Sequence, residues 1–293
     1  MELPLVQLAH LDDLWFQVAG TLCNLTCSHC FISCSPHNRN FGFLDLDTVR
    51  RHLDASVALG VKEYYFTGGE PFLNPAMVPI LELTLRYGPA TVLTNGTVLK
   101  DDWLERLRTA GEASPYSLEF RVSMDGCTAE ENDAVRGVGT FERILRGVRL
   151  LLDHGFMPIL TVTRTRDEQS DGELFAGFVR LLKDRGYTRP RIKILPTLRI
   201  GAETHRQRGY ADAERVTPEM MDGFDDGLLL CNHSRIVTDR GVYVCPILIE
   251  APDARLGATL AEAQRPFALK HQACYTCWQH GVLCANVSTQ AGA

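Results

Sequence analysis

The sequence lacks the features of a membrane or secreted protein. No stretch approaches the ~18 consecutive apolar residues that a membrane-spanning helix needs. The start, Met1-Glu2-Leu3-Pro4, has neither the basic residues nor the apolar core of a signal peptide. Long basic runs are missing too, and 30 Lys and Arg against 36 Asp and Glu give a formal net charge of −6. We therefore expect a cytoplasmic protein that binds neither nucleic acids nor membranes, because both need clustered positive charge.

The cysteine content is not explained by a cytoplasmic location. A reducing cytoplasm disfavours disulfides, yet the chain of 293 residues contains 10 Cys. Apart from the isolated Cys127, they fall into two widely separated clusters. The first cluster comprises Cys23, Cys27, Cys30 and Cys34, and the second comprises Cys231, Cys245, Cys274, Cys277 and Cys284. This segregation favours two metal sites over cysteines scattered through a core.

The first cluster contains the spacing C-x3-C-x2-C, formed by Cys23, Cys27 and Cys30. Three thiolates on one short loop can hold three irons of a four-iron, four-sulfur (4Fe-4S) cluster. The fourth iron would then keep an open coordination position, as catalytic metal sites do. A zinc site is the alternative, but zinc prefers four ligands in paired C-x2-C knuckles. Cys34 is expected to be a buried thiol rather than a ligand.

Hydrophobic patterning predicts six strands that alternate with helices between residues 14 and 200. We expect strands at 14–19, 63–67, 91–94, 117–124, 158–163 and 191–195, and helices at 47–59, 74–86, 101–108, 141–153 and 174–183. Such alternation predicts an α/β fold with parallel strands, either an open doubly wound sheet or a barrel. Because eight units close a full barrel, six units favour a partial one.

Glycine-rich or polar motifs follow successive predicted strands. The cysteine loop follows the first strand, Gly68-Gly69-Glu70-Pro71 the second, Thr94-Asn95-Gly96 the third and Ser123-Met124-Asp125-Gly126 the fourth. Each motif alone is typical of an ordinary turn. However, the carboxyl ends of parallel strands meet at one edge, and that edge carries the active site in barrels and open sheets. The shared position therefore predicts one site.

Together these motifs resemble those of the radical S-adenosylmethionine (SAM) enzymes. The C-x3-C-x2-C loop has a ring residue, His29, before its third Cys, and the Gly-Gly-Glu segment is similar to the family's SAM-binding motif. The resemblance covers roughly residues 14–200 and implies a partial (β/α)6 TIM-like barrel. It also implies a 4Fe-4S cluster on three Cys with SAM on the open iron, and an electron donor such as flavodoxin or ferredoxin. The implied reaction is reductive cleavage of SAM to a 5′-deoxyadenosyl radical, which abstracts hydrogen from a substrate C–H bond.

The resemblance also implies residues that bind SAM. Glu70, with the backbone of the two glycines before it, would hold the methionine ammonium. Arg136 would neutralise the SAM carboxylate or would be an ordinary surface arginine, and Asp125 would shape its turn. The complete set of implied cofactor-binding residues is Gly68, Gly69, Glu70, Asn95, Ser123 and Arg136.

The second cysteine cluster resembles the twitch or SPASM extensions of this family. Residues 235–244 are predicted to form a hairpin that turns at 239–241, and residues 241–246 are similar to the hairpin of those extensions. Full SPASM domains have about seven Cys for two clusters, so five Cys favour one auxiliary 4Fe-4S cluster with four ligands. Cys231, Cys245, Cys274 and Cys277 are the expected ligands, and Cys284 could replace one of them. A zinc knuckle is the alternative. The predicted divisions are an extension (1–13), the barrel (14–200), a bridge (201–225) and the auxiliary domain (226–293).

A fully ligated auxiliary cluster favours electron transfer, and hence oxidation or bond formation after hydrogen abstraction. The first motif begins at residue 23, without an extra peptide-binding domain before it, which favours a small-metabolite substrate. The alternative is a peptide or protein maturase that oxidises or cross-links side chains. A non-catalytic iron–sulfur electron carrier is less favoured, because electron transfer needs no methionine-binding edge. Lys193, Arg199 and His205 follow or lie within the last predicted barrel strand and are candidates to face the substrate.

Overall fold

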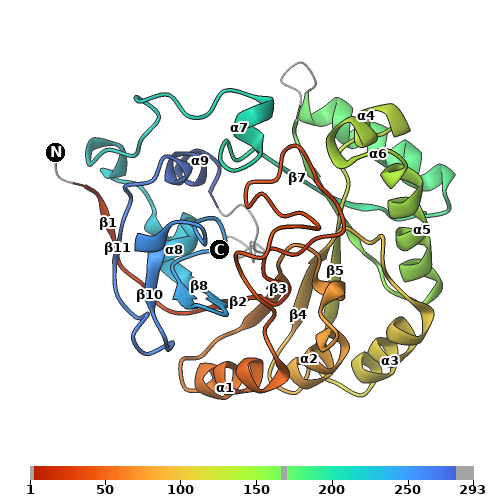
Figure 1. Ribbon diagram of the computed structural model, residues 1–293, viewed down its shortest axis with the longest axis horizontal. Coiled ribbons are helices and arrows are strands. Elements are labelled where there is room, and N and C mark those ends of the chain that lie inside the picture. Colours follow the sequence, from red (N-terminus) through yellow and green to blue (C-terminus); the bar gives the residue numbers. More distant parts are fainter. Residues whose placement is uncertain (1–2, 166–169, 282–293) are drawn as a thin grey trace, which may run out of the picture.

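The computed structural model describes residues 3–165 and 170–281. Nine strands of this part form one sheet in the order β10-β9-β8-β2-β3-β4-β5-β6-β7. The six predicted strands are confirmed, and they run parallel in sequence order. They are β2 (Asp13–Gln17), β3 (Glu63–Thr67), β4 (Ala90–Thr94), β5 (Leu118–Ser123), β6 (Ile159–Thr163) and β7 (Arg191–Leu195). The two ends of the sheet, β10 and β7, do not pair with each other, so the barrel is partial, as predicted (Figure 1).

Helices cover the outer side of the curved sheet (Figure 1). They are α1 (Leu46–Val57), α2 (Met77–Thr84), α3 (Asp101–Glu112), α4 (Ala129–Arg136), α5 (Thr140–Asp153) and α6 (Asp171–Asp184), followed by the single turn α7 (Glu203–Arg206). Short 3-10 turns occupy Pro71–Leu73 (η1), Glu219–Met221 (η2), Asp226–Leu228 (η3) and Pro252–Ala254 (η4). Among the described residues, no helix has the length and apolar character needed to cross a membrane.

Several helices differ from the predictions: α3 continues to Glu112, α6 begins at Asp171, and two further differences have a clear physical reason. The helix expected from residue 74 begins at Met77, because Asn74 makes other contacts: its amide donates to the carbonyls of Val18 (2.7 Å) and Leu44 (2.8 Å). Helix α4 was not predicted at all. It has only eight residues and a charged sequence, but Thr128 caps it by accepting from the backbone N–H of Glu131. A Thr with a Glu three residues later is a recognised helix start, and this signal was present in the sequence.

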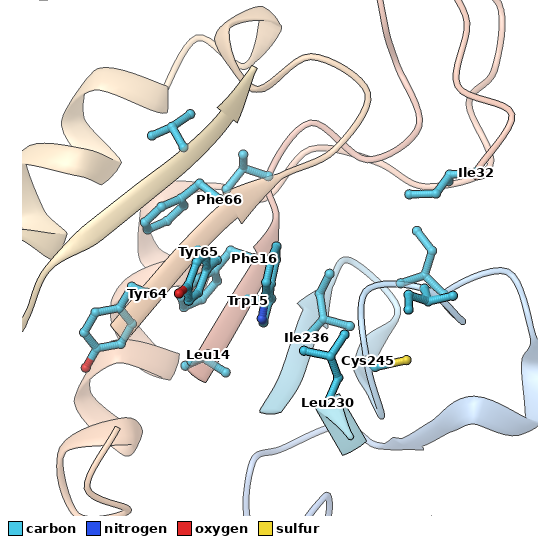
Figure 2. Packing of buried hydrophobic residues seen from close by; sticks show 14 of the residues in the cluster. Leu14, Trp15, Phe16, Ile32, Tyr64, Tyr65, Phe66, Leu230, Ile236 and Cys245 are labelled. Carbon is cyan, nitrogen blue, oxygen red and sulfur yellow. The ribbon is translucent and has the colours of Figure 1, made fainter. Parts of the chain in front are cut away.

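Alternation along the strands separates a packed outer layer from the interior of the barrel. Phe16 and Phe66 stack with ring centroids 5.4 Å apart, while their neighbours Trp15 and Tyr65 stack at 4.3 Å on the other face of the same strands (Figure 2). Trp15 also lines the cavity at the carboxyl edge of the sheet. The interior face of the strands therefore leads directly to the cysteine loop.

The cysteine-rich C-terminal region continues the barrel sheet. Strand β8 (Ser234–Thr238) pairs parallel with β2, and the predicted hairpin forms as β8 with β9 (Gly241–Tyr243), followed by β10 (Arg255–Gly257). Helices α8 (Leu230–His233) and α9 (Ala273–His280) flank this hairpin in sequence. The N-terminal strand β1 (Leu5–Val6) pairs with β11 (Phe267–Ala268), so the first residues are joined to this region. The domain divisions remain a prediction, and the sheet runs through the division at residue 226.

The contact between α5 and the loop after β4 allows a first test. A Cβ added at Gly147 would lie 2.0 Å from the carbonyl oxygen of Gly96, whereas one added at Gly111 of α3 would meet nothing within 4 Å. We expect Gly147→Ala to lower the free energy of unfolding by about 1–3 kcal/mol through overpacking. Gly111→Ala, the control, should raise it by about 0.5–1 kcal/mol through helix propensity. Urea denaturation of the metal-free chain measures both, and equal effects of the two changes would contradict the predicted contact.

Candidate functional site

The first four cysteines lie on one loop that leaves β2 and folds back on itself. The loop is closed by hydrogen bonds from Cys23 N to Ser35 O (3.1 Å) and from Ser35 N to Thr21 O (3.4 Å). Cys23, Cys27, Cys30 and Cys34 all line a cavity of ≈ 200 Å³ at the carboxyl edge of the parallel strands. The cysteine loop therefore reaches the edge of the sheet at which the sequence predicts the motifs to meet.

The surroundings oppose the thiolate form of Cys23 and Cys27 but favour that of Cys30. Burial raises the pKa of Cys23 to about 12 and that of Cys27 to about 11. Hydrogen bonds from Cys34 lower the pKa of Cys30 to about 6, and the backbone N–H of Cys34 lies 3.3 Å from the Cys30 sulfur. A metal centre would supply the positive charge that stabilises three adjacent thiolates. Residues 23, 27 and 30 thus fit a cluster, with Cys34 placed as a donor to one of its ligands.

The glycine turn after β3 is in direct backbone contact with the cysteine loop. Gly69 N donates to Gly20 O (2.9 Å), and Glu70 N donates to Leu22 O (3.0 Å). A Cβ at Gly69 would lie 2.0 Å from the Leu22 carbonyl oxygen. Only glycine allows this approach, which explains why the motif needs glycine there. Gly68 and Gly69 both line the cavity, as expected for a backbone site.

Glu70 follows the two glycines and connects the turn to the next strand. Its side chain is fully buried, and its carboxylate accepts hydrogen bonds from Thr94 Oγ1 (2.7 Å), Asn95 N (2.8 Å) and Phe72 N (3.1 Å). Glu70 is absent from the residues that line the cavity. Burial raises its pKa to about 6. Through these hydrogen bonds Glu70 joins the turn after β3 to the end of β4, and its contact with the methionine ammonium stays a prediction.

Asn95 reaches the cysteine loop from the end of β4. Its amide nitrogen donates to Asn24 Oδ1 (2.9 Å) and lies 3.8 Å from the Cys23 sulfur, while its carbonyl accepts from Thr97 N (2.9 Å). Asn95 lines the cavity, and Ser123 at the end of β5 lines it as well. Both predicted residues are therefore positioned to contact a bound cofactor.

Arg136 is a buried partner of the cysteine loop rather than a surface arginine. Its Nε lies 2.6 Å from Asp125 Oδ2, and its Nη1 lies 4.0 Å from the Cys27 sulfur. The same Asp125 oxygen lies 3.0 Å from His29 Nε2. Burial alone would raise the pKa of Asp125, but Arg136 and His29 lower it below its usual range. Asp125 therefore does more than shape a turn, because it connects β5, α4 and the cysteine loop.

The second cysteine cluster surrounds a separate apolar cavity. Its lining residues are Leu229, Leu230, Cys231, Val244, Cys245, Ile247, Leu248, Phe267, Leu269, Ala273, Cys274 and Cys277. Four of the five predicted ligands therefore line one cavity: Cys231 comes from α8, Cys274 and Cys277 come from α9, and Cys245 lies two residues after β9. The fifth, Cys284, lies outside the described residues. Burial raises the pKa of Cys245 to about 12 and raises that of Cys274 further. Ile247 also lines the first cavity, so the two cavities share a wall.

The spacing of these sulfur atoms bears on the type of metal centre. In the described ranges, no three His, Cys, Asp or Glu side chains are close enough to share a single metal ion. Thiolates that bind different irons of one cluster stand farther apart than thiolates that share one zinc ion. Both cysteine sets line a cavity.

A polar cavity of ≈ 580 Å³, lined by three arginines that each have a carboxylate neighbour, opens beside the first one. Its lining residues are Arg164, Pro196, Thr197, Arg199, Gln207, Arg208, Thr276, Gln279 and His280. Lys193 lines a smaller cavity that shares Arg164, Pro196 and His280 with it, and Pro196 lines the cysteine cavity too. Arg199 and Lys193 thus lie where the sequence places them, whereas His205 lines none of these cavities. Arg164 was missed, although it directly follows β6 at the same edge.

Comparisons with known proteins agree with this arrangement. A family model, the radical SAM superfamily, matches residues 18–165. The chain is 35% identical over 159 residues to the AdoMet-dependent heme synthase of Methanosarcina barkeri, covering 53% of this chain and 43% of that protein. It is 27% identical over 256 residues to the mycofactocin maturase MftC of Mycobacterium tuberculosis, covering 78% of this chain and 62% of the maturase. The chain therefore spans about half the length of these curated relatives.

The fold is similar to that of solved structures as well. SuiB of Streptococcus suis, crystallised with S-adenosylmethionine, superposes with a TM-score of 0.65 at 15% sequence identity. The superposition covers 84% of this chain and 63% of SuiB. At this identity the likeness concerns the fold, and it includes the C-terminal region beyond the family model.

The Asp125 ion pairs provide the test of this site. Asp125→Asn keeps the shape of the side chain but leaves the buried Arg136 guanidinium without its carboxylate. We expect a loss of about 3–5 kcal/mol in the free energy of unfolding, measured by urea denaturation of the metal-free chain. Glu130→Gln, on the exposed side of α4, is the matched control and should change it by less than about 0.5 kcal/mol. An unchanged urea midpoint for Asp125→Asn would show that Arg136 does not depend on this carboxylate.

Proposed function

The chain belongs to the radical SAM superfamily, whose members use a 4Fe-4S cluster and SAM, and we propose that it oxidises or cross-links a substrate at a C–H bond with the help of one auxiliary 4Fe-4S cluster. The observation that carries this proposal is the cavity at the carboxyl edge of the sheet, where Cys23, Cys27 and Cys30 face the Gly68-Gly69 backbone. When bound, the cluster and SAM supply a carbon-centred radical that can remove hydrogen from an unreactive C–H bond.

The residues of the first cavity hold and orient the cofactors. The three cysteines of the motif are the cluster ligands, and Cys34 donates a backbone hydrogen bond to Cys30 that keeps this ligand oriented. The backbone of Gly68 and Gly69 and the side chains of Asn95 and Ser123 contact SAM. Glu70 acts as a positioning residue, since its three hydrogen bonds fix the strand ends that carry these groups.

Arg136 takes a double role in this proposal. Its Nε is committed to Asp125, whereas the guanidinium still lines the cavity, where it can meet the carboxylate of SAM. Because Asp125 also holds His29 at 3.0 Å, the ring before the third Cys is fixed in the same network. Apolar lining residues such as Leu25, Leu93 and Ile247 exclude water, which protects a reactive radical.

The auxiliary cluster is assigned to Cys231, Cys245, Cys274 and Cys277. Four thiols around one apolar cavity match the ligand number of a complete 4Fe-4S cluster. With every iron bound by a thiolate, such a cluster transfers electrons rather than binding substrate. The shared wall at Ile247 places it next to the first cavity, which suits an electron acceptor for the oxidation step. An external electron donor such as flavodoxin or ferredoxin completes this scheme.

A peptide substrate is favoured over a small metabolite by the length of the matches. The match to a maturase covers 78% of this chain, whereas the match to the heme synthase covers 53%. Oxidation of a small metabolite remains the second candidate, because the heme synthase and a GTP 3',8-cyclase are also relatives.

Iron content and SAM cleavage test the two clusters separately. The protein reconstituted without oxygen should hold about eight irons, four for each cluster. Cys23→Ala, Cys27→Ala and Cys30→Ala combined should lower this number to about four and abolish formation of 5′-deoxyadenosine. Cys245→Ala should also lower the iron content but leave SAM cleavage by the first cluster measurable. Retained cleavage in the triple variant would refute the assignment of the first site, and about four irons in the unchanged protein would refute the auxiliary cluster.

The substrate class can be tested with an extract of the source organism separated by size. Added to the reconstituted protein with SAM and dithionite, the fraction that contains the substrate should increase 5′-deoxyadenosine formation several-fold. A peptide substrate predicts that the stimulation is in the large fraction and is lost after protease treatment of that fraction. The triple cysteine variant is the control and should not respond. Stimulation by a small, protease-resistant fraction would favour the metabolite instead.

A further inference from the structure

Arg235 of β8 is a buried arginine with no carboxylate partner in the described part of the chain. Arg235 is only 1% exposed. No Asp or Glu from residues 3–165 or 170–281 forms an ion pair with it. Two other buried arginines each have a carboxylate partner: Arg136 pairs with Asp125, and Arg121 pairs with Glu119. Arg235 is therefore the unusual case.

The guanidinium of Arg235 is held by backbone carbonyl groups alone. Its Nε donates to Ala263 O (2.9 Å), its Nη1 donates to Cys231 O (2.8 Å) and Ser234 O (2.7 Å), and its Nη2 donates to Arg265 O (2.9 Å). These bonds satisfy the donors and fix the plane of the group, but the carbonyls are neutral and leave the positive charge uncompensated. A buried charge without a counter-charge is strongly unfavourable.

The groups next to Arg235 identify the missing counter-charge. Arg235 is in direct contact with the segment that carries these cysteines, because its Nη1 donates to the carbonyl of Cys231 (2.8 Å), and Cys231 and Cys245 both line the auxiliary cavity. Figure 2 shows Cys245 beside Leu230, the first residue of α8, and Ile236, which lies within β8. As neutral thiols these cysteines compensate nothing. As ligands of a metal centre they are thiolates, and a 4Fe-4S core with four thiolates is net anionic.

We propose that Arg235 is the built-in counter-charge of a net-anionic metal–thiolate centre held by Cys231, Cys245, Cys274 and Cys277, and that it sets the reduction potential of this centre. This inference rests on the auxiliary cluster of the proposed function. Reduction adds an electron to a centre that is already anionic, so a fixed positive charge beside it makes reduction easier. The fork of hydrogen bonds holds that charge in place, which makes Arg235 a positioning and tuning residue rather than a ligand.

The test separates the charge of Arg235 from its hydrogen bonds. It uses the full chain with Cys23, Cys27 and Cys30 changed to Ala, so that only the auxiliary cluster contributes to the spectrum. Arg235→Gln removes the charge, and Arg235→Lys keeps the charge but loses the fork. Arg265→Gln changes an exposed arginine of the same region and is the matched control. Iron content and the midpoint potential are measured after reconstitution without oxygen.

A charge effect predicts a definite order of potentials. Arg235→Gln should make reduction at least tenfold less favourable, a lowering of about 59 mV for one electron. Arg235→Lys and Arg265→Gln should stay within about threefold of the parent, about half that shift on the same scale. Equal shifts in the Gln and Lys variants, or no shift in either, would overturn the proposal. If Arg235→Gln holds no cluster, the charge explanation requires Arg235→Lys to keep about four irons, and loss from both variants overturns it.

The parent protein, which has the three cysteine changes but keeps Arg235, separates a failure of the auxiliary cluster from a failure of the role of Arg235. A parent that holds no iron in this background removes the auxiliary cluster, and with it the role of Arg235. A parent with about four irons whose potential is insensitive to the charge at position 235 leaves the auxiliary cluster intact and removes only the role of this arginine.

Discussion

The backbone contact between the glycine turn after β3 and the cysteine loop is the constraint on which the rest of the site depends. Two hydrogen bonds and the absence of a side chain at Gly69 bring residues 68–70 against residues 20–22. This contact fixes where Cys23 begins its loop relative to the glycine turn that lines the same cavity. Glu70 then extends the same constraint to β4, because its buried carboxylate holds Thr94 and Asn95. A cofactor bound in the cavity meets groups whose positions are set by neighbouring backbone rather than by flexible side chains.

The two cysteine cavities differ in how charge is compensated. Beside the first, Arg136 and His29 share the carboxylate of Asp125, so the charges of the protein largely cancel before any cofactor binds. Beside the second, backbone carbonyls alone hold the Arg235 guanidinium, and no Asp or Glu of the described residues pairs with it. The first cavity is suited to a cluster whose charge is adjusted by SAM, and the second to a cluster that carries its full set of thiolates. This contrast follows from which side chains are buried near each set of sulfur atoms.

Strand β2 connects these two environments. The cysteine loop follows β2, and β8 pairs with β2 along its length, with Cys231 just before β8 and Cys245 just after its hairpin partner β9. The auxiliary cavity is thus attached to the barrel by sheet hydrogen bonds instead of a flexible linker. Ile247 completes the connection, because its side chain lines both cavities. A fixed separation between two redox centres is what dependable electron transfer requires.

Local sequence was enough to predict the six parallel strands, the cluster loop and the edge where the motifs converge, since these features depend on short-range spacing and on strand periodicity. It also predicted Cys231, Cys245, Cys274 and Cys277 as one set. The tertiary structure decided what the buried charges do. Glu70 faces the end of β4, Arg136 pairs with Asp125, and Arg235 donates to residues as distant in sequence as Arg265. Each of these outcomes depends on which groups far apart in the chain are desolvated together, and no local pattern encodes that.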